Sequence, residues 1–336
     1  MVRIQPVDPH DEDAFAQWYA VMRASATHGR TAPTVWAEAT LTHWYRHPNP
    51  RRSRVALAAV DESRAPGARV VGVASVELPL DVDTETAEVD VEVLPTERGR
   101  GVGSALWEAT LEVCRAERRT VLQAEVNVPV GVRDQSSPGL RFARDRGFTS
   151  ENIEDHLALP LGGGLPSGTA APDAGAGHRF ISWVDRAPDD LVAAYAAMQT
   201  LMNADVPTGG LVRTPRPVEV ADVRHAEERQ AKGFRSLVTL ALTTGGEPAG
   251  YTLVFVPKGD EDNLLQDDTY VIRSERGHRL GQRLKTANLA QVREVAPASR
   301  WLHTWTEQGN APMHRTNRAF GFSKVETMHE VQLLLA

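Results

Sequence analysis

Cysteine is almost absent from this chain of 336 residues, which contains one, Cys114. A single thiol cannot form an internal disulfide, so packing must hold the fold together, and we interpret Cys114 as a structural residue within a helix. The opening residues lack the apolar core of a secretory signal, and no uninterrupted apolar run is long enough to cross a bilayer. These absences predict a cytoplasmic protein.

An excess of positive charge is missing as well. The formal net charge is −7 at pH 7, and the four lysines all lie in the second half of the chain. The protein therefore has no overall positive field that would attract nucleic acid or an anionic membrane. We expect a small-molecule or peptide partner that is recognised locally, and no nucleic-acid or membrane partner. The oligomeric state, monomer or homodimer, stays open.

The chain has enough apolar residues for two hydrophobic cores. Hydrophobic residues make up 41% and charged residues 24%, which is typical of a globular protein. A chain of this length exceeds what one core usually supports. Residues 161–177 are rich in glycine, proline and alanine and predict a flexible linker. We therefore expect an N-terminal domain at residues 1–160 and a C-terminal domain at residues 178–336.

The two predicted domains repeat one another. Short matches recur in the same order with an offset of about 174–178, which equals a whole domain and indicates a duplication. The clearest matches are Gly72 with Gly250, Arg98-Gly99 with Arg276-Gly277, and Gly147-Phe148 with Gly321-Phe322.

Each half also predicts the same order of elements: strand, helix, three strands, a glycine-containing turn, helix, strand, short helix and a last apolar run. This order is typical of an α+β domain with a mostly antiparallel central sheet. In the first half the main expected elements are helices at 13–25 and 104–117 and strands at 55–60, 70–77, 87–93 and 120–127. In the second they are helices at 189–203 and 282–292 and strands at 237–242, 249–256, 269–272 and 300–306. We expect the loops at 27–54 and 205–234 to shape the pocket of a substrate.

The strand at 87–93 alternates apolar and acidic residues, so that Val89, Val91 and Val93 face one side and Glu88, Asp90 and Glu92 the other. It leads into a turn with glycines at 99, 101 and 103 that opens a helix. Glycine lets a backbone approach a ligand closely, and the first amides of a helix point outward at its positive end. The pattern predicts a site for a phosphate or pyrophosphate.

Three phosphate-binding designs use such a turn. A P-loop requires a Gly-Lys-Ser/Thr sequence, which is missing. A dinucleotide fingerprint requires a third glycine where this chain has Ser104 or Leu106. The remaining design, Arg-x-x-Gly-x-Gly, is met by Arg98, Gly101 and Gly103.

With this motif the sequence resembles the Gcn5-related N-acetyltransferases (GNAT), in which the pyrophosphate of coenzyme A lies on the same turn. The resemblance covers nearly the whole chain. It implies two tandem GNAT-fold domains, each with a mostly antiparallel, twisted central sheet flanked by helices. It also implies acetyl-CoA as the acyl donor, without a metal.

In the second half Arg276 and Gly281 keep the motif, whereas Arg279 replaces the middle glycine. Arg279 could crowd the pyrophosphate, bind a phosphate through its guanidinium, or be a solvated side chain on a decayed copy. Residues 304–313, followed by Asn317, resemble the C-terminal domain of tandem bacterial acetyltransferases. That resemblance makes the second copy the better candidate for a working site.

The resemblance assigns cofactor contacts to both turns. It also implies a bulge in the strand before the turn, at Val91–Val93 or Thr269–Val271, where a backbone amide points at the thioester oxygen. In the first copy the expected residues are Val91, Glu92, Val93, Arg98, Gly99, Arg100, Gly101, Val102, Gly103 and Ser104. In the second copy they are Thr269, Tyr270, Val271, Arg276, Gly277, His278, Arg279, Leu280, Gly281 and Gln282, together with Asn310.

Carboxylates are the candidates for accepting a proton from the substrate. Asp90 and Asp268 occupy matching positions, and Glu307 follows the adjacent strand; each could instead be a solvated surface charge. The tyrosine that commonly protonates the leaving thiol in this family is replaced by Ala143 and Asn317. Solvent, another side chain such as His314, or a catalytically silent copy would account for that difference.

The resemblance thus implies an N-acetyltransferase that moves an acetyl group from acetyl-CoA directly to a primary amine of a small molecule or peptide in a ternary complex. The alternative is a catalytically degenerate sensor or scaffold that binds acyl-CoA, and the missing tyrosines favour it.

Overall fold

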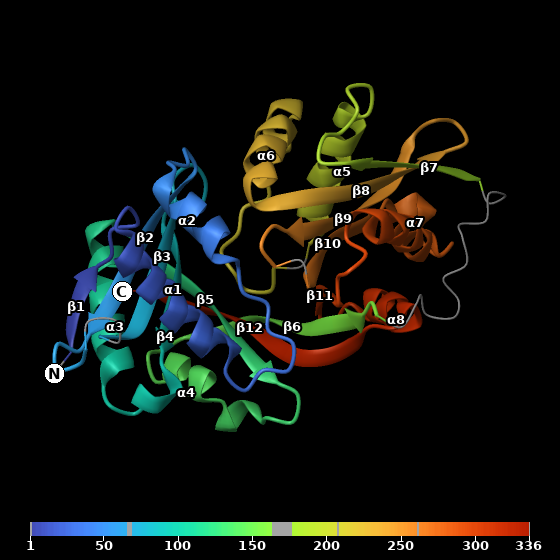
Figure 1. The fold of residues 1–336 in the computed structure, drawn as a ribbon. Coiled ribbons are helices and arrows are strands. Elements are labelled where there is room, and N and C mark those ends of the chain that lie inside the picture. The colour runs from blue at the N-terminus through green and yellow to red at the C-terminus, as the bar shows by residue number, and fades with distance from the viewer. Residues whose placement is uncertain (1, 66–68, 163–176, 207, 261, 336) are drawn as a thin grey trace. The chain divides into compact units, whose positions relative to one another are not determined.

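The computed structural model describes residues 2–65, 69–162, 177–206, 208–260 and 262–335 (Figure 1). Two compact units divide the chain. Unit 1 comprises Met1–Ile153, Thr208–Thr214 and Glu326–Ala336, and unit 2 comprises Glu154–Pro207 and Pro215–Val325. Most of the predicted linker, residues 163–176, lies outside the described residues.

Unit 1 contains a sheet in the order β1-β2-β3-β4-β5-β12. Neighbouring strands run antiparallel except β4 and β5, which are parallel. Its elements are β1 (Arg3–Pro6), α1 (Glu12–Thr27), α2 (Glu38–Arg46), β2 (Arg52–Val60), β3 (Val70–Pro79), β4 (Thr86–Val93), η2 (Pro95–Glu97), α3 (Val102–Ala116), β5 (Val121–Pro129), η3 (Asp134–Ser136) and α4 (Pro138–Arg144).

Unit 2 repeats this plan with the order β6-β11-β10-β9-β8-β7, in which β10 and β11 form the parallel pair. Its elements are β6 (Thr149–Pro160), β7 (His178–Val184), α5 (Val192–Asp205), α6 (Val220–Gly233), β8 (Phe234–Thr243), β9 (Pro248–Pro257), β10 (Asn263–Val271), η4 (Arg273–Glu275), α7 (Leu280–Val295), β11 (Trp301–Glu307) and α8 (Ala311–Phe320). The last strand, β12 (Ser323–Leu334), belongs to unit 1 from Glu326 onward. The predicted α+β class with a mostly antiparallel sheet is confirmed. Helices α2 and α6 occupy segments that we expected to be loops.

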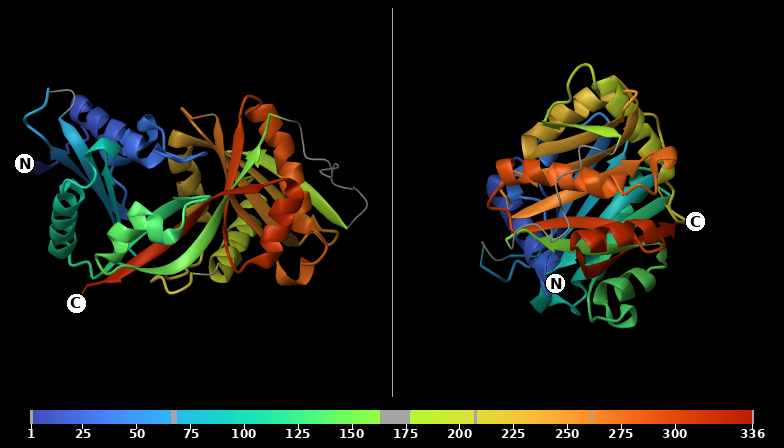
Figure 2. Two further views of the ribbon diagram at one scale, coloured as in Figure 1. Left: turned by 90° about the horizontal axis from the view of Figure 1, so that it is seen from below. Right: turned by 90° about the vertical axis from the view of Figure 1, so that its right-hand side faces the viewer.

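Helices cover both faces of the strands in unit 1 because successive side chains of a strand point to opposite faces. In β2, Ala56 and Ala58 pack with α1, whereas Leu57 and Ala59 pack with α3. Figure 2 (left) shows α1, in blue, and α3, in teal, on opposite sides of these strands. The predicted alternation in β4 is also confirmed, since Val91 and Val93 pack on the α3 side.

The same packing detail recurs in both units, which supports a duplication. A Cβ at Gly72 would lie 3.0 Å from Leu106 of α3, and a Cβ at Gly250 would lie 3.2 Å from Leu284 of α7. Each glycine therefore lets the helix that follows the turn approach its sheet closely. The two leucines are 178 residues apart, which is the offset of the turns.

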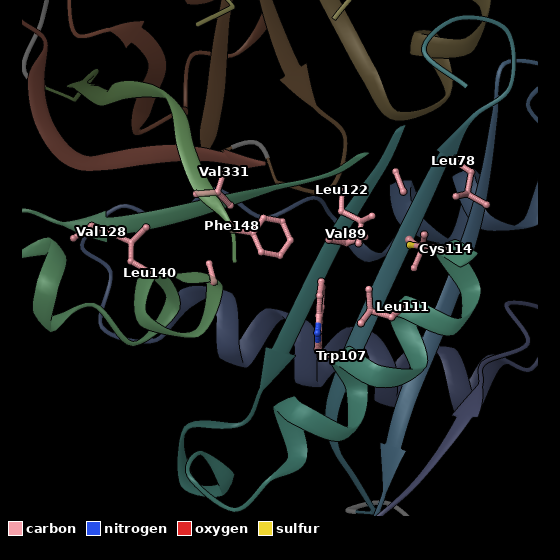
Figure 3. Close-up of a cluster of buried hydrophobic side chains, with 13 residues drawn as sticks. Leu78, Val89, Trp107, Leu111, Cys114, Leu122, Val128, Leu140, Phe148 and Val331 are labelled. Atoms are coloured by element: carbon pink, nitrogen blue, oxygen red, sulfur yellow. The ribbon is translucent and has the colours of Figure 1, made fainter. Parts of the chain in front are cut away.

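The last strand of each half completes the other half's sheet. In unit 1, β12 pairs with β5 from Glu326↔Pro129 to Leu334↔Val121. Figure 3 shows the side chain of Val331 next to Phe148 in the hydrophobic cluster of this unit.

In unit 2, Glu154–Pro160 of β6 pair with β11, and Leu157 and Leu159 join the core. The compact units therefore differ from the predicted domains 1–160 and 178–336, because most of β6 belongs to unit 2 and most of β12 to unit 1. An apolar strand can complete any sheet that offers an open edge.

A buried ion pair fixes the start of β12 within unit 1. Both nitrogens of the Arg30 fork donate to the Glu326 carboxylate at 2.6 Å, and the glutamate side chain is fully buried. Unit 1 also holds residues 208–214, where Val212 N donates to the amide oxygen Oε1 of Gln332 at 2.9 Å. Part of the loop that we expected to shape a substrate pocket is thus bound along β12.

Among the described residues, no helix combines the length and the apolar character that crossing a bilayer requires.

The exchange of last strands predicts where a core mutation acts. Val331 is 2% exposed, so we expect Val331→Ala to lower the free energy of unfolding by about 2 kcal/mol. Hydrogen exchange should accelerate in β5 and α3, which lie more than 200 residues earlier in the chain. Leu334→Ala, at a position 66% exposed, is the matched control and should change little. Faster exchange confined to β8, β9 and β10 would contradict the assignment of β12 to unit 1.

Candidate functional site

The predicted glycine turn of the first copy joins β4 to α3. Gly99 and Gly101 have φ values of 76° and 82°, and Gly101 is the residue from which α3 begins. Among the described residues no side chain caps this helix. Its first amides are therefore free to bind an anion at the positive end of the helix.

The second copy builds the same turn between β10 and α7. Gly277 has a φ of 88°, and Arg279 begins α7 with a φ of 56°, in the left-handed region that costs a non-glycine residue about 1 kcal/mol. No described side chain caps α7 either. The backbone geometry of the turn is thus kept although Arg279 replaces glycine, and the arginine side chain is exposed.

The motif arginines hold the turn to the preceding strand. Arg98 Nε donates to Val93 O at 3.1 Å, and Arg276 Nε donates to Val271 O at 2.9 Å. A second bond of each arginine reaches the end of a helix, from Arg98 to Ser25 Oγ at 3.0 Å and from Arg276 to Asp205 at 2.7 Å. Both guanidinium groups therefore bind protein groups that position the turn.

The third glycine of the motif has a different environment in each copy. A Cβ at Gly103 would lie 2.9 Å from Cε2 of Phe142, whose ring carries the guanidinium of Arg146 at 3.4 Å. At Gly281 the nearest atom, Cγ2 of Thr269, would be 3.7 Å away, which is ordinary contact. Gly103 is therefore required for packing in the first copy, rather than only for the approach of a ligand as we expected.

Beside each turn, the two parallel strands stop pairing with one another. The ladder between β4 and β5 ends at Glu88↔Gln123, and that between β10 and β11 ends at Leu265↔His303. The strands continue over described residues without further mutual pairing. Strand edges offer backbone donors and acceptors, so each edge could bind an extended ligand arm that leads away from the turn.

A β-bulge distinguishes the second copy. Gln266 pairs with Val254 and Thr269 with Thr252, so that β10 has one more residue than β9 between these pairs. The extra residue falls at Asp267-Asp268, just before the predicted bulge at Thr269–Val271.

The prediction of a bulge at Val91–Val93 is wrong. Over its described residues β4 pairs with β3 one to one from Glu88↔Glu77 to Val93↔Gly72. The strict alternation of apolar and acidic residues in β4 leaves no residue to insert, whereas two adjacent acids interrupt the alternation in β10.

The acids of the bulge have raised pKa values. The Tyr251 hydroxyl donates to the Asp268 carboxylate, and burial raises the pKa of Asp268 nonetheless. Burial, and then the charge of Asp268, raise the pKa of Asp267 to about 8. The Asp267 side chain is nevertheless exposed. Solvent therefore screens part of the rise in its pKa, and a substrate amine can approach the carboxylate. Sequence reasoning missed Asp267, although the adjacent pair of acids was a visible signal.

The first copy places single acids on its regular strand. Burial, followed by the charges of Glu88 and Glu77, raises the pKa of Asp90 to about 6. Burial also raises the pKa of Glu92 to about 7, but its carboxylate accepts a hydrogen bond from the Ser25 hydroxyl. Glu88 and Asp90 are both exposed, and Glu88 pairs with Arg52, which leaves Asp90 as the candidate acid of this copy, without a bulge beside it.

The other predicted site residues lie in β4, β10, the two turns and the helices that follow them, or near the start of α8. Glu307, at the end of β11, accepts a bond from Gly309 N at 2.7 Å, and Asn310 caps α8 through Met313 N. His314 Nε2 lies 3.2 Å from Glu307 O. The remaining predicted residues are Val91 and Glu92 in β4, Arg100 in the turn with a bond to Glu97, Val102 and Ser104 in α3, Tyr270 in β10, His278 in the second turn, and Leu280 and Gln282 in α7.

Two comparisons of sequence place these features among known proteins. A family profile described as "Acetyltransferase (GNAT) family" matches residues 15–148. The chain is 26% identical over 244 residues to the mycothiol acetyltransferase of Sanguibacter keddieii, a match that covers 71% of either protein.

Solved structures extend the likeness to both halves. A tandem GNAT protein from the clavulanic acid biosynthesis pathway is 28% identical and has a TM-score of 0.82, covering 99% of this chain and 98% of its own. A GCN5-related N-acetyltransferase from Sphaerobacter thermophilus has a TM-score of 0.69 at 16% identity and covers 99% and 95%, respectively, which shows a shared fold.

The contrast between the third glycines yields a matched pair of substitutions. Gly281→Ala should raise the free energy of unfolding by about 0.5–1 kcal/mol, because alanine favours the helix and has room. Gly103→Ala should lower it by about 1 kcal/mol, because the Phe142 ring would have to move away from Arg146. Urea unfolding followed by circular dichroism compares the two. Equal effects of the same sign would contradict the different packing of the two turns.

Proposed function

The chain belongs to the GNAT acetyltransferase family, and on that premise we propose that it transfers an acetyl group from acetyl-CoA to a primary amine of a small molecule or peptide. The transfer is direct, with donor and acceptor bound together. We assign the chemistry to the copy formed by β10, α7 and β11. The observation that carries this assignment is the bulge with its two acids at Asp267-Asp268, next to an uncapped helix.

The turn before α7 fits the diphosphate of coenzyme A. The amides of Leu280 and Gly281 lie in the uncapped first turn, where the helix dipole favours an anion. Arg279 precedes them with an exposed guanidinium, which can bind a phosphate oxygen at short range. In this proposal the amides and Arg279 hold the diphosphate, while Arg276 keeps the turn in place.

The bulge supplies a donor for the thioester oxygen. Asp268 O accepts bonds from Thr252 Oγ1 at 3.0 Å and from Gln266 Nε2 at 3.1 Å. Because C=O and the following N–H point in opposite directions across a trans peptide, the Thr269 N–H points away from these partners. In our proposal it faces the edge where β11 no longer pairs, and it polarises the thioester carbonyl there.

Asp267 accepts the proton that the acceptor amine must lose. An alkyl amine is an ammonium at neutral pH and becomes a nucleophile only after deprotonation. A base works best when its pKa lies near the working pH. The pKa of Asp267 is raised from its usual range, and its side chain has access to solvent. Asp268, held by the Tyr251 hydroxyl, is a positioning residue whose charge raises that pKa.

The test of this function is release of coenzyme A thiol from acetyl-CoA in the presence of candidate amines, including aminoglycosides, polyamines and amino acids. Acetyl transfer releases the thiol in proportion to the acylated amine, which mass spectrometry identifies. Binding of acetyl-CoA without thiol release from any amine would support the sensor instead. Absence of binding would remove both functions.

Once an acceptor is found, the role of Asp267 predicts a pH profile. At saturating amine the wild-type rate should rise with pH to a plateau above the raised pKa of Asp267, as this carboxyl group loses its proton. Asp267→Asn should lower kcat by about 100-fold or more and remove this rise. Asp90→Asn removes the candidate acid of the first copy, at the position that matches Asp268, and is the control. A larger loss of kcat in Asp90→Asn would assign the chemistry to the first copy.

The raised pKa of Asp267 also predicts an effect on stability, which needs no acceptor. Because its pKa is raised, Asp267 holds its proton in the folded state to a higher pH than in the unfolded chain, where an aspartate loses it near pH 4. Between these values the folded state binds more protons, so the free energy of unfolding should fall as pH rises. In Asp267→Asn this fall should be smaller. Thermal unfolding from pH 5 to pH 8 measures it, and parallel curves for both proteins would show that the pKa is not raised.

A further inference from the structure

A buried lysine on α7 has no role in the function proposed above. Lys285 is 3% exposed, and its Nζ lies 5.5 Å from the centre of the Phe322 ring. Burial alone lowers the pKa of Lys285 to about 7, without a contribution from any carboxylate among the described residues. A buried ammonium without an anion is unfavourable, so this position favours a ligand that carries negative charge.

The geometry of α7 directs Lys285 toward the end of β10. Gly281 precedes Lys285 by four residues on the same face of the helix, and its Cβ position is 3.7 Å from Thr269 and 3.8 Å from Val271. Side chains of a helix lean toward its N-terminus. The stem of Lys285 therefore extends over the part of β10 that no longer pairs with β11.

Asn317 on α8 is bonded to Phe322 through the backbone. Its side chain is fully buried, its Nδ2 donates to Thr306 Oγ1 of β11 at 3.0 Å, and its backbone oxygen accepts from Phe322 N at 3.0 Å. Among the described residues its Oδ1 has no hydrogen-bond partner. A buried acceptor without a donor points to a ligand N–H, such as an amide of the pantetheine arm.

We propose that Lys285 binds the sulfur of the departing coenzyme A in the second copy and supplies its proton. This inference rests on the proposed acetyl transfer. In it Lys285 protonates the leaving thiolate, which neither Ala143 nor Asn317 can do because their side chains have no acidic proton. Asn317 orients the arm that carries the sulfur.

The step balances as follows in atoms and charge. The acceptor nitrogen forms a bond to the acetyl carbonyl carbon, the carbon–sulfur bond breaks, and its electron pair goes to sulfur. The Lys285 ammonium transfers a proton to sulfur, which yields the free thiol, and Lys285 regains a proton from water. The acceptor ammonium loses two protons in all: the first goes to Asp267 before the attack, and the second leaves the nitrogen for water once its bond to the carbonyl carbon has formed. A thiol has a pKa of about 8.5, close enough to the value of about 7 at Lys285 for the proton to pass between them.

The experiment measures the thiol of bound coenzyme A and needs no acceptor. All proteins carry Gly101→Glu, which places a carboxylate at the turn of the first copy and weakens phosphate binding there. Thiolate absorbance is titrated with coenzyme A bound to the otherwise wild-type protein and to Lys285→Met, Lys285→Gln and Lys285→Arg. Lys324→Met, which removes a surface lysine paired with Asp155, is the matched control.

With Lys285 present, the thiolate of bound coenzyme A should form at a pH lower by about 1 or more than in Lys285→Met and Lys285→Gln. Lys285→Arg and Lys324→Met should keep the low value. Desulfo-coenzyme A, which lacks the sulfur, should bind all variants alike and so reports an intact site.

The same thiol pKa in wild type and both neutral variants would overturn the role of Lys285 and leave acetyl transfer standing. Loss of desulfo-coenzyme A binding in both neutral variants would show that Lys285 is a structural residue, and this result would also overturn its proposed role as a proton donor. If the Gly101→Glu protein binds neither ligand, the second copy does not hold coenzyme A, and both the inference and the assignment of the chemistry to this copy fail.

Discussion

The amides at the start of α7, which no described side chain caps, are the constraint on which the rest of the site depends. A helix end without a capping side chain needs another acceptor, and an anion satisfies it with the help of the helix dipole. β10 feeds this turn directly and has left its parallel partner β11 before reaching it. A ligand held by its phosphates at the turn is therefore led along an open strand edge toward the acids of the bulge.

The two copies keep the backbone of this arrangement and differ in its side chains. Gly72 with Leu106 and Gly250 with Leu284 preserve the close approach of helix and sheet. The second copy alone has the bulge in the strand before the turn. The first copy instead uses Gly103 to pack Phe142 under Arg146. Such divergence fits a duplication in which one copy retained the chemistry.

Local patterns predicted most of the fold because they depend on neighbouring residues. The alternation of Val89, Val91 and Val93 with acids defined β4, and the glycine turn defined the start of α3. The destination of β12 could not be predicted in the same way, since an apolar run such as that around Val331 looks alike whichever sheet it joins.

The sequence predicted the parts of the candidate site that a motif marks. It did not predict the residues whose properties depend on how deeply they are buried. Arg276 and Gly281 located the second turn, and the acid pair at Asp267-Asp268 interrupted the alternation that a regular strand would show. In the sequence Lys285 has a place in the pattern of tandem acetyltransferases but no role, because the fall in its pKa follows from burial, which the sequence does not reveal.

A structure of the protein with acetyl-CoA tests the central claim most directly. We expect the diphosphate within hydrogen-bond distance of the amides of Leu280 and Gly281, and the thioester oxygen at the Thr269 N–H. Acetyl-CoA bound at the start of α3 alone, or away from both turns, would contradict the assignment of the chemistry to the second copy.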